Sequence, residues 1–531
     1  MRDLSRPGRS PVQTTGAMAA TSHPLSTQAA LAILQKGGNA MDAAIAACAV
    51  QCVVEPGSTG IGGDCFCMYA PEGSADIVAF NGSGRAPSGA TASALTGAGV
   101  TQIERHSPHA VTIPGAVDAW SRLSADHGRL QLADVLAPAI GYAEHGFPLS
   151  SRVQFDFARN EEFLSADPVS AATYLRDGVV PETGSVLRLP LLAKTLKSIA
   201  EEGRDVFYRG WVARDIVEHL QSLGGFHTME DFAEASGDYV TPISSNFDNR
   251  TVMQCPPNGQ GVIALLLLNM MQQFEVEAGG PLTADRIHTE IEACRLAYTA
   301  RNLFVGDPEF STSPVEALLS SDYAQTLASA IDPGKANLPT PQFPLPAHRD
   351  TVYISVVDEE RNACSFINTL FFGFGSGITT PSSGVTLHNR GQGFVLEEGH
   401  PNCIAPGKRP LHTIIPALIV EDGRTVMSYG VMGGQYQAFG HMQFLTRHFD
   451  FGFDLQEAMD LPRFMVDPNT GEVEMENAIG SDIREQLVAR GHAITTPEVP
   501  VGGSQAIAID WDNNVLTGAS DPRKDGCALG Y

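Results

Sequence analysis

Two threonines that frame a predicted β-hairpin are the first residues whose types and spacing could support chemistry. The six residues after Thr351 alternate in the manner of a strand, and the charged Glu359–Arg361 is the turn into a second strand. If those three residues form the loop, Asp358 faces Asn362, and counting back along both strands places Thr351 opposite Thr369. Two hydroxyl groups then meet at the end of the hairpin. Because threonine is a good strand former, composition alone favours a structural role for both.

The segments around this hairpin resemble the gamma-glutamyltransferase family of N-terminal-nucleophile (Ntn) hydrolases, also called glutathione hydrolases. The likeness extends from about Ser22 to the terminal Gly530-Tyr531. In that family a precursor cuts itself immediately before a threonine, and Thr351 is the matching residue. The resemblance implies an α+β fold with four αββα layers, processed into a large segment, 1–350, and a small segment, 351–531, that remain together as one catalytic domain.

A threonine at the start of a chain needs no catalytic triad. Its hydroxyl is a weak nucleophile at neutral pH, and its own α-amine supplies the base that it requires. A free α-amine has a pKa of about 7.7–8.0, so a useful neutral fraction exists near neutrality. Cleavage before Thr351 therefore creates the base. We expect the same hydroxyl to attack the Asp350 carbonyl, giving an ester that water then opens.

The resemblance also assigns the groups that would assist Thr351. Gly433 and Gly434 match the family's double glycine, whose N–H groups bind the tetrahedral oxyanion. Glycine suits that role because it lets the substrate approach the backbone closely, although a double glycine by itself is usually only a turn. Thr369 would orient the hydroxyl or the amine of Thr351.

The residues by which the family holds a γ-glutamyl group are largely replaced. Its carboxylate-binding arginine is matched by Ser83, with Arg85 two residues later; its Asn, Gln and Asp ligands are matched by Phe371, Arg390 and Gly393, and its Ser-Ser pair by His412-Thr413. We predict a substrate site that includes Arg85, Arg390, His412 and Thr413. Arg85, Arg390 or both would hold a substrate carboxylate, the alternative for each being an internal salt bridge.

These replacements leave two interpretations of the activity. The first is a gamma-glutamyltransferase-like amidohydrolase that attacks a small, carboxylate-bearing amide and releases the acyl group to water. The alternative is an amidohydrolase or acylase for a non-glutamyl amide, such as oxamate or a dicarboxylic monoamide, because the α-amino group of a glutamyl donor has lost acceptors here. A dinucleotide-binding oxidoreductase and a non-catalytic scaffold represent the other classes of function.

Composition limits the partners and the compartment. With 60 acidic and 34 basic residues the formal charge is −26, which argues against nucleic acid and anionic membranes as partners. No stretch reaches the roughly 18 apolar residues of a membrane helix, and the N-terminus has positive charge but no apolar run after it. Nine cysteines fit a reducing compartment. We expect a cytoplasmic enzyme that needs no cofactor, acts on a small molecule and has a homodimer as one candidate assembly.

Other motifs suggest ligands only superficially. The loop Gly57–Asp64 is glycine-rich, but it follows a helix and leads into a strand, the reverse of a dinucleotide-binding loop. His288 and Glu292 at helical spacing could bind a metal, yet a surface or subunit-contact pair is the preferred interpretation. A two-by-two metal site is conceivable at four cysteines without a nearby histidine: Cys48, Cys52, Cys65 and Cys67. We expect no metal.

Overall fold

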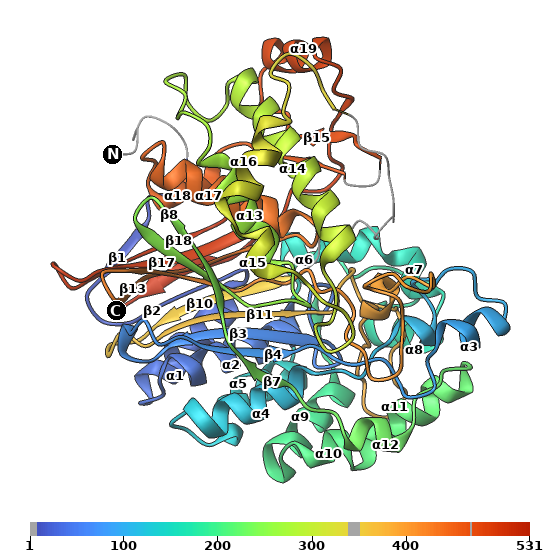
Figure 1. The fold of residues 1–531 in the computed structure, drawn as a ribbon. Coiled ribbons are helices and arrows are strands. Elements are labelled where there is room, and N and C mark those ends of the chain that lie inside the picture. Colours follow the sequence, from blue (N-terminus) through green and yellow to red (C-terminus); the bar gives the residue numbers. More distant parts are fainter. Residues whose placement is uncertain (1–7, 338–350, 468–469) are drawn as a thin grey trace.

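The computed structural model describes residues 8–337, 351–467 and 470–531, and two stacked seven-stranded sheets form its centre (Figure 1). The first sheet has the order β1 (Val12–Thr14), β18 (Val515–Ser520), β17 (Gly503–Asp510), β13 (Arg424–Met432), β12 (Ala417–Glu421), β9 (Arg250–Gln254) and β8 (Ile243–Phe247). The second has the order β19 (Cys527–Gly530), β2 (Met18–Thr21), β10 (Val352–Val357), β11 (Ala363–Thr369), β3 (Asp64–Ala70), β4 (Val78–Gly82) and β7 (Asp238–Val240). Each sheet contains strands from both sides of residue 350.

Helices cover the outer face of each sheet (Figure 1). The second sheet packs against α1 (Pro24–Gln35), α2 (Ala40–Val54) and α4 (Ala116–His127). The helices α5 (Leu132–His145), α9 (Pro190–Glu202) and α11 (Trp211–Ser222) belong to the same core but pack mainly on other helices. The first sheet packs against α13 (Gly261–Met271), α17 (Tyr436–Phe449) and α18 (Leu455–Asp460), and α14 (Ala284–Phe304) packs on α13. This arrangement confirms the predicted α+β fold with four αββα layers.

Shorter elements surround these layers. Small sheets are formed by β5 (Phe147–Pro148) with β6 (Val186–Leu187), and by β14 (Phe464–Val466), β15 (Val473–Met475) and β16 (Ile494–Thr495). The remaining α-helices are α3 (Ala92–Gly97), α6 (Ser151–Arg159), α7 (Glu161–Ser165), α8 (Pro168–Tyr174), α10 (Asp205–Tyr208), α12 (Met229–Ala233), α15 (Val315–Leu318), α16 (Ser321–Ser329) and α19 (Ser481–Ala489).

The alternation of side chains in β10 explains where the hairpin points. Ile354 and Val356 belong to the core between the second sheet and its helices, whereas Tyr353 and Val357 belong to the core between the two sheets. Because side chains two residues apart share a face of a strand, Thr351 has the same orientation as Tyr353. The end of the hairpin therefore faces the gap between the sheets.

The sequence predicts a cap at Ser26 or Thr27 for the first helix and at Asn39 for the second, and these two predictions have different outcomes. Asn39 caps α2 as expected, because its Oδ1 accepts hydrogen bonds from the N–H groups of Met41 and Asp42, each at 3.1 Å. The predicted cap of α1 at Ser26 or Thr27 is wrong. That helix begins at Pro24, whose fixed φ suits the first helical position, and His23 is the cap.

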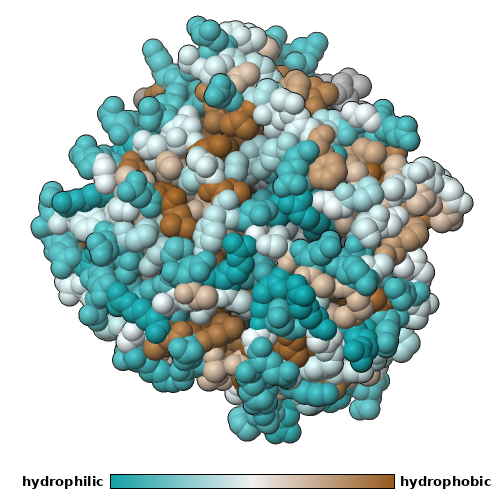
Figure 2. Space-filling view, turned by 60° about the horizontal axis from the view of Figure 1, so that its bottom comes forward, coloured by the Kyte–Doolittle hydropathy of each residue, from teal (hydrophilic) through white to brown (hydrophobic). Residues whose placement is uncertain are grey.

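The surface is predominantly hydrophilic on the face shown in Figure 2, where small hydrophobic patches are separated by polar side chains. Among the described residues, no helix combines the length and the apolar character needed to cross a bilayer.

Candidate active site

The hairpin brings the two predicted threonines together. Val352 pairs with Asn368 in the antiparallel register of β10 and β11, which continues to Thr351 opposite Thr369 as predicted. The two Oγ1 atoms are 3.3 Å apart, and both side chains are buried. Thr369 Oγ1 also accepts a hydrogen bond of 2.9 Å from the N–H of Phe371. Asp350, on the other side of the predicted cleavage point, lies outside the described residues.

The glycine-rich loop 57–64 packs beside this strand end. It connects α2 to β3, which agrees with the prediction that it is not a dinucleotide loop. Asn368 donates from Nδ2 to Thr59 Oγ1 at 2.8 Å and to the carbonyl oxygen of Gly60 at 3.2 Å. A Cβ atom at Gly63 would lie 2.2 Å from the carbonyl oxygen of Thr369, so only glycine fits there. The loop thus fixes the end of β11.

Gly433 and Gly434 form the turn between β13 and α17. Their φ angles are +118° and +56°, and a Cβ at Gly433 would lie 2.8 Å from Cα of Gly502. Their carbonyl groups are engaged: Gly433 accepts from the N–H of Tyr436 at 3.0 Å, and Gly434 accepts from the N–H of Gln437 at 3.2 Å. Within the described residues, the N–H groups of the two glycines donate to no backbone carbonyl. The turn therefore has the donors that an oxyanion requires.

A buried hydrogen-bond network supports this turn, and no sequence motif predicted it. Gln260 donates from Nε2 to the carbonyl oxygens of Gly434, at 3.1 Å, and of Thr413, at 2.9 Å. Its Oε1 accepts from Arg301 Nη1 at 3.0 Å, and the same nitrogen bonds Oε1 of Gln435. Burial lowers the pKa of Arg301 to about 10, so the guanidinium remains charged at neutral pH. These contacts connect α14 to the glycine turn.

Arg390 is a buried cation with unused hydrogen-bonding capacity. Its guanidinium lies 3.7 Å from the centre of the Phe371 ring, and Nη1 donates to Thr413 Oγ1 at 3.2 Å. Its side chain is fully buried, and among the described residues no acceptor faces Nε or Nη2. Burial lowers the pKa of Arg390 to about 9, while Asp64 opposes that change. Two orphan N–H groups on a buried guanidinium indicate a place for an anion.

His412 lies in the same region but is already paired with Asp64. Its Nε2 is 3.0 Å from Asp64 Oδ2, His388 Nδ1 is 3.4 Å from that oxygen, and the N–H of Gly84 donates to Asp64 Oδ1 at 2.9 Å. Burial, together with Arg390, lowers the pKa of His412 to about 3. Burial would raise the pKa of Asp64, but the two histidines lower it well below its usual range. Asp64 is therefore a buried anion beside Arg390.

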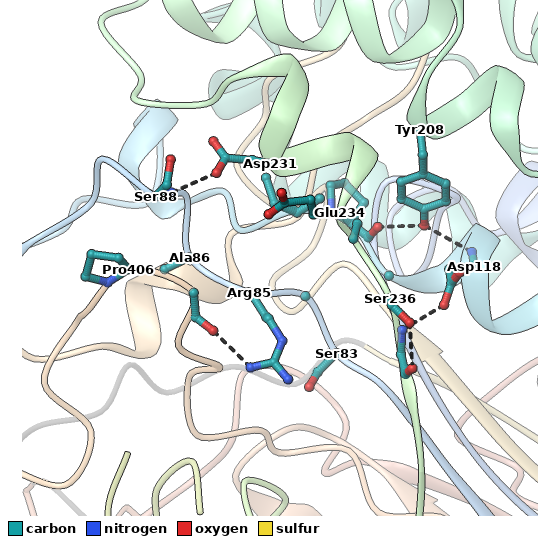
Figure 3. Close-up of a pocket in the computed structure, with 17 residues that line it drawn as sticks. Ser83, Arg85, Ala86, Ser88, Asp118, Tyr208, Asp231, Glu234, Ser236 and Pro406 are labelled. Atoms are coloured by element: carbon teal, nitrogen blue, oxygen red, sulfur yellow. Dashed lines mark hydrogen bonds between the residues drawn. The ribbon is translucent and has the colours of Figure 1, made fainter. Parts of the chain in front are cut away.

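Arg85 lines a cavity that includes neither Thr351 nor Arg390. This cavity has a volume of about 350 Å³, and its lining also includes Ser83 (Figure 3). Its guanidinium donates to both carboxylate oxygens of Glu309, at 3.0 and 2.8 Å, and to the carbonyl oxygen of Gly407 at 3.0 Å. Arg85 Nη2 also lies 3.5 Å from Asp238 Oδ2. Arg85 thus has the internal salt bridge that was its alternative role.

His288 and Glu292, which could bind a metal, lie in a buried hydrogen-bonded cluster. Among the described residues, the group of histidine, cysteine and acidic side chains with closely spaced ligand atoms is His288, Glu292 and His492. All three are buried, so His288 and Glu292 are not a surface pair, but His288 does contact His492 across the predicted division between the large and the small segment. His288 Nε2 bonds the Asp332 carbonyl oxygen at 2.7 Å, and Nδ1 lies 2.7 Å from His492 Nε2. Arg295 donates to the remaining nitrogen of His492. Hydrogen bonds thus engage both nitrogens of each imidazole.

The cysteines do not form a metal group with one another in the part of the chain that is described. Cys67 on β3 and Cys364 on β11 are neighbours in the second sheet, with their Sγ atoms 3.8 Å apart. Burial raises the pKa of Cys67, of Cys65 and of Cys48, which keeps these thiols protonated.

Comparisons with known proteins agree with this geometry. The family profile described as Gamma-glutamyltranspeptidase matches residues 26–531. The chain is 36% identical over 523 residues to the glutathione hydrolase-like YwrD proenzyme of Bacillus subtilis, covering 97% of this chain and 98% of that protein. It is 35% identical to the oxamate amidohydrolase proenzyme of Klebsiella pneumoniae, covering 98% and 99%. The crystal structure of cephalosporin acylase from Bacillus halodurans has a TM-score of 0.93 and 37% identity, covering 100% of this chain and 99% of that one.

Proposed function

Because this chain belongs to the gamma-glutamyltranspeptidase family, we propose that Thr351 is the nucleophile of its amidohydrolase activity and the residue before which the precursor cuts itself. The observation that carries the proposal is the buried pair of Thr351 and Thr369 at a strand end that faces the gap between the sheets. Gly433 and Gly434 would stabilise the oxyanion, and Thr369 would orient the Thr351 hydroxyl or amine.

Self-cleavage at Asp350/Thr351 would divide the chain into 1–350 and 351–531 without dividing the fold. The relatives are proenzymes, which implies a large and a small subunit from one precursor. Hydrogen bonds between β10 and β2, and between β11 and β3, cross that division inside one sheet. Breaking one peptide bond leaves these ladders intact, so the two segments stay associated.

The mature enzyme should lose activity at acidic pH. We expect kcat/KM to rise with pH through an apparent pKa at or somewhat below about 7.7–8.0, because the neutral α-amine of Thr351 is the base. The residue is fully buried, and burial disfavours the charged amine. His412, with a pKa of about 3, stays neutral over this range, so its titration does not change the pH profile of kcat/KM. A profile that is flat from pH 5 to 9, under conditions where chemistry limits the rate, would contradict the amine as base.

Arg390 is the residue that we propose to bind a substrate carboxylate, with its Nη1 donating to Thr413 Oγ1 and with His412, paired to Asp64, in the same region. The support is its two orphan N–H groups in a buried setting, whereas the nitrogens of Arg85 are engaged by acidic residues. A γ-glutamyl group also carries an α-ammonium, which a guanidinium repels. This favours the second candidate function, hydrolysis of an amide whose acyl group has a carboxylate and no amino group.

A panel of amides distinguishes the two candidate functions. Glutaryl and γ-glutamyl anilides differ only in the α-amino group, and oxamate provides a much shorter acyl group. We expect the glutaryl amide to have the higher kcat/KM of the matched pair, by roughly tenfold or more for a charge facing a buried cation. A butyryl anilide, which lacks the carboxylate, is the control. A clear preference for the γ-glutamyl amide would contradict the second function and support the first.

We also propose a cytoplasmic location, which the nine cysteines without a disulfide support. The homodimer stays a prediction.

A further inference from the structure

Gln437 lies beside the nucleophile, and nothing in the sequence singled it out. It is in the first turn of α17 and is fully buried. The backbone N–H of Ile415, which can only donate, bonds Oε1 of Gln437 at 3.1 Å. This contact fixes the orientation of the amide, because the oxygen must face Ile415. The NH₂ group therefore points the other way, and Nε2 lies 3.5 Å from Thr351 Oγ1.

The position of Gln437 couples the nucleophile to the oxyanion turn. Its own N–H donates to the carbonyl oxygen of Gly434, which Gln260 also holds. The buried guanidinium of Arg301 supports Gln260 in turn. The side-chain donor and the two glycine N–H groups thus stand on one rigid junction between strand and helix. A shift of this junction would move both sets of donors relative to Thr351.

We propose that Gln437 is a catalytic residue that donates a hydrogen bond to Thr351 Oγ1 whenever this oxygen acquires negative charge. The inference rests on the proposed function. In self-cleavage, Oγ1 loses its proton and bonds to the Asp350 carbonyl carbon; the peptide C–N bond breaks, and the nitrogen takes the proton and becomes the α-amine. Water then opens the ester, so that Asp350 keeps the carboxylate and Oγ1 regains a proton.

Substrate turnover passes through the same charge changes. Oγ1 gives its proton to the α-amine while it attacks the amide, and the departing amine receives that proton. During hydrolysis of the acyl-enzyme, Oγ1 is the leaving oxygen and again carries charge. An N–H donor at 3.5 Å is a weak partner of a neutral hydroxyl, but the bond shortens and strengthens as the acceptor becomes anionic. The donor is most useful in self-cleavage, where the α-amine is still an amide.

The alternative is that Gln437 only satisfies the N–H of Ile415 within the core. Two substitutions separate these roles. Gln437→Glu is isosteric and keeps an acceptor for Ile415, but it replaces the NH₂ donor by an oxygen. Gln437→Met removes both functions at similar volume. The matched control is Gln443→Met: Gln443 is buried on the same helix, where Oε1 accepts from Tyr436 and Nε2 faces Glu290.

The experiment measures the half-time of precursor cleavage on denaturing gels and the steady-state kinetics per mole of cleaved enzyme, with the melting temperature of each variant. We expect both Gln437 variants to slow cleavage and to lower kcat by about 10- to 100-fold, less than the loss of a well-aligned oxyanion donor. For Gln437→Met, KM and the apparent pKa of the pH profile should stay unchanged, because neither the carboxylate site nor the amine is altered. The carboxylate of Gln437→Glu should raise that pKa, because it favours the charged amine.

The control variant should cleave and turn over within about twofold of the parent, even if its melting temperature falls. The proposal is overturned if Gln437→Glu cleaves and turns over at the parental rate, or if Gln443→Met slows both rates as much as Gln437→Met. Failure of the proposed function would be a different result, namely cleavage of a Thr351→Ala chain. If that chain stays intact while the Gln437 variants match the parent, only the role of Gln437 is wrong.

Discussion

Replacing Thr351 by alanine should leave one uncut chain of 56.5 kDa that has no amidohydrolase activity. The parent should give two bands, near 37 and 19 kDa, which is the 350:181 division of that mass. The expected loss of kcat is on the order of 10⁴-fold or more, because the substitution removes both the attacking oxygen and the cleavage that frees its base. Denaturing gels and amide hydrolysis measure the two effects.

Thr351→Ser is the informative control for this experiment. It keeps a hydroxyl at the same place, so it should still cleave, more slowly if the methyl group restricts the rotamer of the native side chain. A Thr351→Ala protein that is fully processed would show that another group cuts the chain, and the nucleophile assignment would then be wrong.

Replacing Arg390 by methionine should lower kcat/KM for a carboxylate-bearing amide by about 2–4 kcal/mol in transition-state terms, or roughly 30- to 1,000-fold. The reason is that the buried guanidinium offers Nε and Nη2 to the substrate carboxylate, and methionine offers no donor. Self-cleavage should continue. The measurement compares glutaryl and butyryl anilides, because only the first carries the carboxylate and only its rate should fall strongly.

Arg85→Met is the matched control, since it removes the same charge from a cavity that does not include Thr351. Because it removes the ion pairs with Glu309 and Asp238, we expect it to change the stability of the protein more than the rate of catalysis. If Arg85→Met alone lowers the rate, the carboxylate binds there instead. If both variants process normally and hydrolyse the glutaryl amide at the parental rate, the idea of an arginine clamp is wrong.

Local patterns predicted several parts of the site correctly. The register of Thr351 and Thr369 followed from a strand period of two residues and a three-residue loop, both of which act over short distances. The same holds for the Asn39 cap and for the rejection of a dinucleotide loop at 57–64. His23 was missed as a helix cap because a proline at the first helical position outweighed the serine and threonine that follow.

What the sequence by itself determined is the hairpin that brings Thr351 opposite Thr369 and, through the family resemblance, the layered fold; the roles of Thr351, Gly433 and Gly434 in catalysis stay proposals. Only the tertiary structure decided which charges are compensated. Asp64 meets His412 across 348 positions of the chain, Arg85 meets Glu309 across 224, and Gln437 reaches Thr351 across 86. Such pairings depend on how two sheets stack, and no local period or propensity encodes them. Burial of Arg390 without a full set of partners is likewise a property of the packed molecule, because desolvation exists only once the surrounding layers have closed.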